Sequence, residues 1–381
     1  MVGRVAQMRK EGISVISFAQ GEPDFATPAP IKAAAVEALE QNITRYTPAG
    51  GMPELRQAVA EQLSRDTGLS YTFKQVTVTS GAKEALYLAL QAICDAGDEV
   101  IIPAPYWVSY VEQARLAYAT PVIIDTDEAS NFKLKPEQLA AALTPRTRMV
   151  ILCSPSNPTG MVYTADELQA LAEVLRPSSA IVITDEIYDH ICYNNNFCRW
   201  LQVAPDFAER TLVINGASKT FAMTGWRIGY AGGPVAYIEG MRSIQSHSTT
   251  HPASIAQYAS LKAFRPSDEL DAIVAHMKTA FQERRDLMLE ELAQIPGVSC
   301  LVPDGAFYVF PNITGLLNQP LRDGVTCATS KALAEYLLEK AHIAVVFGEA
   351  FGTPGYVRLS YAQDNASLRE GMRRFREAVA R

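Results

Sequence analysis

Short runs of apolar, β-branched residues alternate with longer segments of helical periodicity between about positions 75 and 235. Near-continuous apolar runs are typical of strands buried on both faces of a parallel sheet. The segments between them, such as residues 84–93 and 165–175, have the period of helices. The pattern therefore predicts an α/β fold with an open, mostly parallel sheet covered by helices. The seven expected strands are residues 76–79, 99–102, 120–124, 149–153, 180–184, 211–215 and 228–231.

The pattern changes after about position 265. Residues 268–294 have the pattern of one long amphipathic helix, which Ile295-Pro296-Gly297 closes. Strand patterns at 306–310 and 356–361 and a charged helix at 365–380 follow, and residues 15–18 are also strand-like. We therefore expect a large domain over residues 31–283. Residues 1–30 and 284–381, from both chain ends, are expected to form a small α+β domain.

Composition and charge restrict the class of protein. The 381 residues are 48% hydrophobic and 20% charged, which is typical of a globular chain. The net charge of −7 argues against a nucleic-acid partner held by its phosphates. No apolar run approaches the roughly 18 residues that cross a membrane. The N-terminal segment contains Arg4, Arg9 and Lys10, whereas the core of a secretory signal would be purely apolar. Six scattered cysteines indicate reduced thiols, so we expect a cytoplasmic enzyme without membrane or nucleic-acid partners.

Candidate chemistry follows the ends of the predicted strands, where ligands of open α/β sheets bind. Ser80-Gly81-Ala82 opens a helix after the first strand, which is typical of a phosphate cradle. Taken singly, each candidate has an ordinary alternative: a turn asparagine, a magnesium site or helix cap for the carboxylate, and a surface lysine. The later strands are followed by Asn157, by Asp185 and Tyr188, and by Ser218, Lys219 and Arg227.

One ligand, pyridoxal 5′-phosphate, accounts for all of these residues. It requires a lysine amine for its aldehyde, a carboxylate at its pyridine nitrogen, an aromatic ring to stack on, donors for its phenolic oxygen and a phosphate cup. Trp107 is the candidate for stacking, with core packing as its alternative. The residues that meet these needs in turn are Lys219, Asp185, Trp107, Tyr188 with Asn157, and Ser80-Gly81-Ala82 with Arg227.

The segment GASKTFAMTGWRIG at residues 216–229 resembles the lysine signature of the pyridoxal-phosphate-dependent class I aminotransferases of fold type I. The resemblance covers essentially the whole chain and is strongest to bacterial aspartate aminotransferases of the group that includes aspartate/prephenate aminotransferases. Further matches stand in the same order: GEPDF at 21–25, TRYTPAGG around Tyr46, PYW at 105–107, SNPTG around Asn157, DEIY at 185–188 and VRLS at 357–360.

The resemblance implies a role for each matching residue. Lys219 would form the Schiff base and carry the substrate proton, Asp185 would pair with the pyridinium, and Arg358 would bind the substrate α-carboxylate. Tyr46 would reach the phosphate of a neighbouring subunit, which implies a homodimer with shared sites. The remaining implied contacts are Tyr188 and Asn157 at the phenolic oxygen, Trp107 on the ring, Ser80, Gly81, Ala82, Ser218 and Arg227 at the phosphate, and Gly21, Trp107 and Asn157 at the substrate.

The implied reaction moves an amino group from an L-amino acid, above all aspartate, to 2-oxoglutarate by a ping-pong mechanism without a metal. Three departures concern the phosphate and the substrate side chain. Gly216 stands where some relatives have a phosphate-binding serine, and the chain lacks the segment that precedes the match in relatives. Residues 243–264 contain no arginine, only His247 and His251. These histidines either line the substrate pocket or are loop residues, and we favour the second interpretation. Broad or aromatic specificity, a β-lyase and a ligand-sensing domain are the alternatives.

Overall fold

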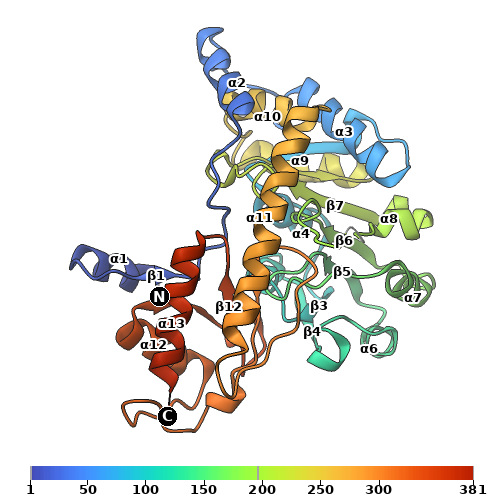
Figure 1. The fold of residues 1–381 in the computed structure, drawn as a ribbon. Coiled ribbons are helices and arrows are strands. Elements are labelled where there is room, and N and C mark those ends of the chain that lie inside the picture. Colours follow the sequence, from blue (N-terminus) through green and yellow to red (C-terminus); the bar gives the residue numbers. More distant parts are fainter. Residues whose placement is uncertain (1, 195–196, 381) are drawn as a thin grey trace.

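A computed structural model describes residues 2–194 and 197–380, and a seven-stranded sheet forms its largest element (Figure 1). All neighbouring strands are parallel except β8, which runs antiparallel to β2 and β7. Each strand coincides with an expected one to within two residues, because buried strands need uninterrupted apolar runs. In spatial order they are β2 (Val76–Thr79), β8 (Gly229–Gly232), β7 (Thr211–Gly216), β6 (Ile181–Asp185), β5 (Thr147–Cys153), β3 (Glu99–Ala104) and β4 (Thr120–Asp125).

Helices cover both faces of this sheet, and strand β5 shows how the two faces divide. Met149 and Ile151 pack against one set of helices, whereas Val150 and Leu152 pack against the other, because successive strand residues point to opposite faces. The first set is α4 (Ala82–Ile93), α5 (Ser109–Leu116) and α9 (Val235–His247), and the second is α3 (Pro53–Thr67), α7 (Ala165–Leu175) and α10 (Ser254–Phe264). The sheet is thus buried on both sides.

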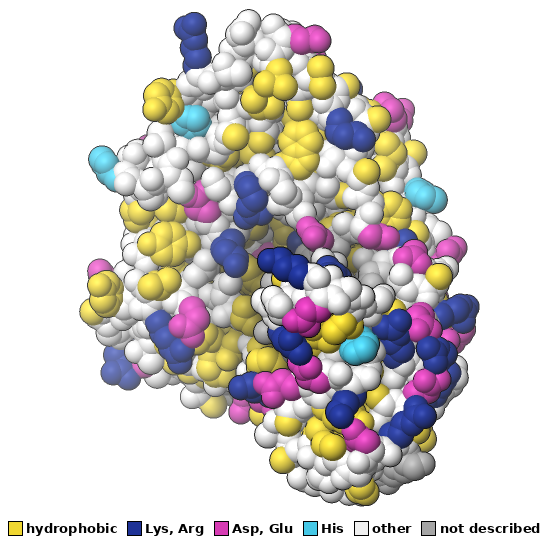
Figure 2. Space-filling model, turned by 90° about the vertical axis from the view of Figure 1, so that its left-hand side faces the viewer, with side chains coloured by type: hydrophobic (Ala, Val, Ile, Leu, Met, Phe, Trp, Pro, Cys, Tyr) yellow, Lys and Arg dark blue, Asp and Glu magenta, His cyan; other side chains and the backbone are white. Residues whose placement is uncertain are grey.

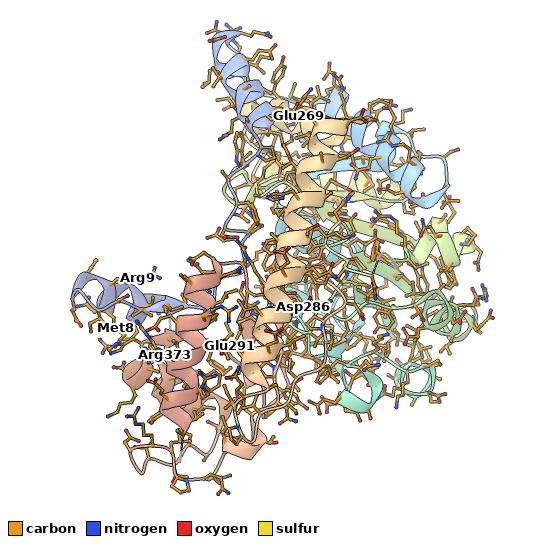
Figure 3. All side chains as sticks on the ribbon, in the orientation of Figure 1. Met8, Arg9, Glu269, Asp286, Glu291 and Arg373 are labelled. Carbon is orange, nitrogen blue, oxygen red and sulfur yellow. The ribbon has the colours of Figure 1, made fainter. Side chains whose placement is uncertain are left out.

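The C-terminal part of the chain forms its own core, and the start of the chain joins it. The helix α11 (Asp268–Leu292) runs along the molecule, and Glu291 lies near its end (Figure 3). Glu291 forms ion pairs with Arg369 and Arg376. Phe18 packs into the same core. The other elements here are α12 (Ser330–Ala341), α13 (Asn365–Val379), the antiparallel strands β11 (Val346–Phe347), β12 (Val357–Ser360) and β9 (Tyr308–Val309), and the parallel pair β1 (Ile16–Ser17) and β10 (Ile343–Ala344).

Four further helices are α1 (Val2–Lys10), α2 (Ala29–Glu40), α6 (Pro136–Ala142) and α8 (Trp200–Val203). Within the described ranges, no helix has the length and apolar character that crossing a membrane requires. All six cysteines are free thiols. The boundaries of the two expected domains stay a prediction.

Candidate active site

A cavity of about 380 Å³ lies where the carboxyl ends of β5, β6 and β7 meet the start of α4 and the C-terminal strands. This is the edge of the sheet at which the sequence places the site. Every predicted site residue lines the cavity except Ser80, Gly81 and Tyr46. The lining consists of Gly21, Ala82, Lys83, Trp107, Val108, Tyr110, Cys153, Asn157, Asp185, Ile187, Tyr188, Ser218, Lys219, Thr224, Arg227, Tyr308, Val346, Phe351 and Arg358.

Lys219 stands three residues beyond β7, and its amine points into the cavity. The amine donates a hydrogen bond to the carbonyl oxygen of Gly21. Burial and, to a smaller extent, the positive charges of Arg358 and Arg227 lower the pKa of Lys219 from 10.5 to about 8, against the opposing charges of Glu22 and Asp185. An amine in this surrounding gives up its proton far more readily than an ordinary lysine does, as a base or nucleophile must.

Asp185 is the last residue of β6, and its carboxylate is 4% exposed. Its Oδ2 accepts a hydrogen bond of 2.6 Å from the Tyr110 hydroxyl, and its Oδ1 accepts one of 3.3 Å from the backbone N–H of Ile187. Burial raises the pKa of Asp185, while the Tyr110 hydroxyl, the Ile187 N–H and the charge of Lys219 act to lower it. Sequence reasoning missed Tyr110, although it follows Trp107 by three residues, the spacing at which helical side chains meet.

Arg358, in strand β12, is buried, and its guanidinium lies near two aromatic rings. Its Nη1 donates to Asn157 Oδ1 and its Nη2 to the carbonyl of Ala19, both over 2.9 Å. The ring centroids of Tyr308 and Phe351 lie 4.4 and 5.2 Å from the guanidinium carbon. Its Nε is buried without a hydrogen-bond partner among the described residues. The side chain is therefore fixed in place with donor capacity left for a carboxylate.

Tyr188 lies one turn beyond Asp185 and is 3% exposed. Its hydroxyl oxygen is 2.8 Å from that of Tyr308, which strand β9 brings to the cavity from the C-terminal part of the chain. Burial raises the pKa values of both hydroxyls, so both carry their protons at neutral pH. Tyr308 was not predicted as a site residue, because its strand pattern does not reveal which cavity it faces.

The predicted phosphate cradle forms at the start of α4. Gly81 precedes the helix with a φ of +85°, and a side chain there would collide with the guanidinium of Arg227. Arg227 is fixed by hydrogen bonds of 3.0 Å to the carbonyl of Ser80 and 2.9 Å to that of Thr224. Because the Ser80 N–H donates to the carboxylate of Glu84, only its hydroxyl is open to the predicted role.

The structure also explains the glycine at position 216. A β-carbon at Gly216 would lie 2.7 Å from the carbonyl oxygen of Ile228 and 2.8 Å from the Cα of Gly229, which is too close for a serine. Ser218, two residues further on, is buried and lines the cavity. It is therefore the hydroxyl available to replace the missing one.

Tyr46 is 90% exposed and lies outside the cavity. Its ring meets that of His251 edge-on at 5.6 Å, and His251 Nε2 accepts the backbone N–H of Thr47 over 3.3 Å. His251 is thus a loop residue, as predicted, whereas His247 is the last residue of α9. In the described part of the chain, no three His, Cys, Asp or Glu side chains are grouped to hold a metal ion.

The cavity brings together a lysine of lowered pKa, a buried carboxylate and a buried arginine. The chain matches the sequence profile of aminotransferase class I and II over residues 13–375, so it belongs to this family. It is an aminotransferase, and its fold is that of fold type I.

This chain matches relatives of known name over nearly their whole length. The chain is 47% identical to aspartate/prephenate aminotransferase of Cereibacter sphaeroides, covering 100% of this chain and 95% of that protein. The aspartate aminotransferase structure from Rhizobium meliloti has a TM-score of 0.94 at 44% identity and covers 99% and 94% of the two chains. The one from Thermus thermophilus with maleate has a TM-score of 0.92 at 42% identity, covering 98% and 94%. These names do not favour a β-lyase or a ligand-sensing domain.

Proposed function

We propose that this aminotransferase uses pyridoxal 5′-phosphate to transfer the amino group of L-aspartate to 2-oxoglutarate. The observation that carries the proposal is the convergence of Lys219, Asp185 and Arg358 on one cavity. Because the pKa of Lys219 is lowered to about 8, a far larger share of its amines is neutral near pH 7.5 than for an ordinary lysine. The amine can therefore take a proton from a substrate carbon without a further base.

The residues present fit the cofactor. Lys219 would bind its aldehyde, Asp185 its ring nitrogen, and Tyr188 and Asn157 its phenolic oxygen. Trp107 would stack on the ring, and the phosphate would lie at Ser80, Gly81, Ala82, Ser218 and Arg227, where the start of α4 offers backbone N–H groups. When bound, pyridoxal phosphate supplies a ring that accepts the electrons left at Cα after proton removal.

The protein side chains then have separable tasks. Arg358 and Asn157 orient the α-carboxylate, because a planar guanidinium binds a carboxylate through two parallel hydrogen bonds. The neutral amine of Lys219 removes the proton from Cα. The buried carboxylate of Asp185, held by Tyr110, would face the ring nitrogen, and the positive charge of the protonated nitrogen would favour the ionised carboxylate.

Lys83 supplies the positive charge for a second carboxylate. Four cationic side chains line the cavity, and Lys219, Arg227 and Arg358 already have tasks. The Lys83 ammonium lies 4.9 Å from the centre of the Trp107 ring, and the acidic residue among those that line the cavity is the buried Asp185. A dicarboxylic substrate is the one whose side chain this charge favours, in keeping with the maleate in the Thermus thermophilus structure.

The half-reaction tests the proposed function. Purified protein with cofactor and L-aspartate, but no 2-oxo acid, should lose the visible absorption of the bound cofactor and release one equivalent of oxaloacetate per site. A chain that performs no such conversion with any of the twenty amino acids is not the proposed enzyme.

Lys83→Met tests the substrate class. Since a hydrogen bond to a charged group contributes about 1.5–3 kcal/mol, we expect KM for aspartate and for 2-oxoglutarate to rise about 10- to 100-fold. KM for alanine and phenylalanine should stay within about twofold, because they lack the second carboxylate. Lys32→Met, at an exposed position of α2, is the control. Equal changes for all four substrates would contradict the assignment of Lys83.

A further inference from the structure

Tyr308 joins three parts of the cavity that the proposed function treats separately. Its hydroxyl lies 2.8 Å from that of Tyr188, and its ring covers the guanidinium of Arg358 at 4.4 Å. A β-carbon on Gly21 would lie 3.0 Å from the Tyr308 hydroxyl oxygen, so that hydroxyl also lies against the backbone whose carbonyl accepts the Lys219 amine. Tyr308 is fully buried, so water does not satisfy its hydroxyl in place of these groups.

Either hydroxyl can donate in the Tyr188–Tyr308 hydrogen bond, so its direction depends on what else Tyr188 binds. Each hydroxyl has one proton to donate, and both are protonated at neutral pH. If the Tyr188 hydroxyl donates its proton to an acceptor in the cavity, its oxygen must accept the hydrogen bond from the Tyr308 hydroxyl. A donor that is itself an acceptor is polarised and donates more strongly.

We propose that Tyr308 is a positioning residue that acts through Tyr188: its hydroxyl donates to Tyr188 and thereby directs the Tyr188 proton to the phenolic oxygen of the cofactor. This proposal rests on the proposed function, since the acceptor belongs to pyridoxal phosphate. It assigns Tyr308 a task that the ring alone cannot perform. The ring, in turn, contacts the guanidinium of Arg358, and a phenylalanine would retain that contact.

The pH titration of the visible absorption of the cofactor-bound enzyme measures this effect. Donation to the phenolic oxygen stabilises its negative charge and so favours the form in which the neighbouring lysine nitrogen has lost its proton. Weakening the hydrogen bond that Tyr188 donates should therefore raise the apparent pKa at which the absorption band changes. We expect Tyr308→Phe to raise it by about half a unit to one unit, and Tyr188→Phe by more.

A double-mutant cycle separates action through Tyr188 from a general effect on packing. In a Tyr188→Phe background, Tyr308→Phe should cause no further shift of the apparent pKa. The Tyr193 and Tyr361 hydroxyls form a similar buried pair at 2.9 Å that does not line the cavity, so Tyr361→Phe is the matched control and should leave the titration unchanged. With Tyr308→Phe, kcat should fall several-fold while KM for aspartate stays within twofold, because the ring over Arg358 remains.

The outcomes are distinct. A wild-type band that titrates, with no shift in Tyr308→Phe, overturns this inference alone. A shift of the same size in the Tyr188→Phe background, or in Tyr361→Phe, also overturns it. A wild-type protein with no cofactor band overturns both this inference and the proposed function.

Discussion

Lys219 shows at the scale of one residue how a site is made reactive at the expense of stability. Its amine is held among groups that favour the neutral form, and the pKa of about 8 measures that preference. Between pH 8 and 10.5 the unfolded chain binds more protons at this position than the folded chain does. The free energy of unfolding therefore rises with pH through this window.

The rise of the free energy of unfolding with pH gives a prediction for the protein without cofactor. Lys219→Met should raise the melting temperature below pH 8, where the folded wild type must keep a buried ammonium, by an amount corresponding to roughly 3 kcal/mol at most. The difference between variant and wild type should shrink as the pH approaches 10.5. Thermal unfolding at several pH values measures it, with the exposed Lys32→Met as control. A difference that does not depend on pH would contradict the lowered pKa.

At the scale of elements, buried ion pairs fix the turn that follows β6. Asp185 faces the cavity, whereas Glu186 and Asp189 face Arg199, which also lies 3.2 Å from Asp66. Asn215, near the end of β7, donates to Asp189 over 2.9 Å. The turn carrying Asp185 and the strand leading to Lys219 are thus tied together behind the cavity.

Arg199→Leu should lower the free energy of unfolding by about 3–5 kcal/mol, because it leaves buried carboxylates without their counter-charge. The matched control is Arg176→Leu, whose ion pair with Asp206 spans 3.0 Å between partly exposed side chains. Its effect should stay below about 1 kcal/mol. Urea unfolding of both variants measures the difference, and equal losses would show that the buried pairs contribute no more than the surface pair.

The strands of the large sheet could be predicted from the sequence because a strand buried on both faces is an uninterrupted run of apolar residues. The sequence also predicted Lys219, Asp185 and Arg358, since each occupies a recognisable place in a motif. It did not predict Tyr110, Tyr308 or Lys83. Their positions in the cavity depend on which way a helix or strand faces after packing, and neither apolar periodicity nor spacing determines that contact.

At the scale of the whole molecule, the exposed Tyr46 supports the proposal of a homodimer with shared sites. Tyr46 is 90% exposed and Val36 and Leu39 of α2 are more than half exposed, so all three side chains are free to contact a partner. Figure 2 shows hydrophobic side chains spread over the upper part of one face, whereas charged side chains crowd its lower part.

Mixed dimers test shared sites. Lys219→Ala and Tyr46→Ala chains should each have little activity alone at limiting cofactor. Co-expressed, they should recover about a quarter of the wild-type activity, because half of the dimers are mixed and each of these has one intact site. Lys219→Ala with Arg358→Ala should recover none, since both residues line the same chain's cavity. Recovery in the second pair, or none in the first, would contradict sharing through Tyr46.

The walls of the cavity come from Gly21 at one extreme of the chain and Arg358 at the other. During synthesis, therefore, no nascent chain that lacks its last strand can hold a substrate, however well the large sheet has already formed. The residues assigned to the vitamin-derived group end at Arg227, so its place is synthesised well before the arginine that binds the substrate.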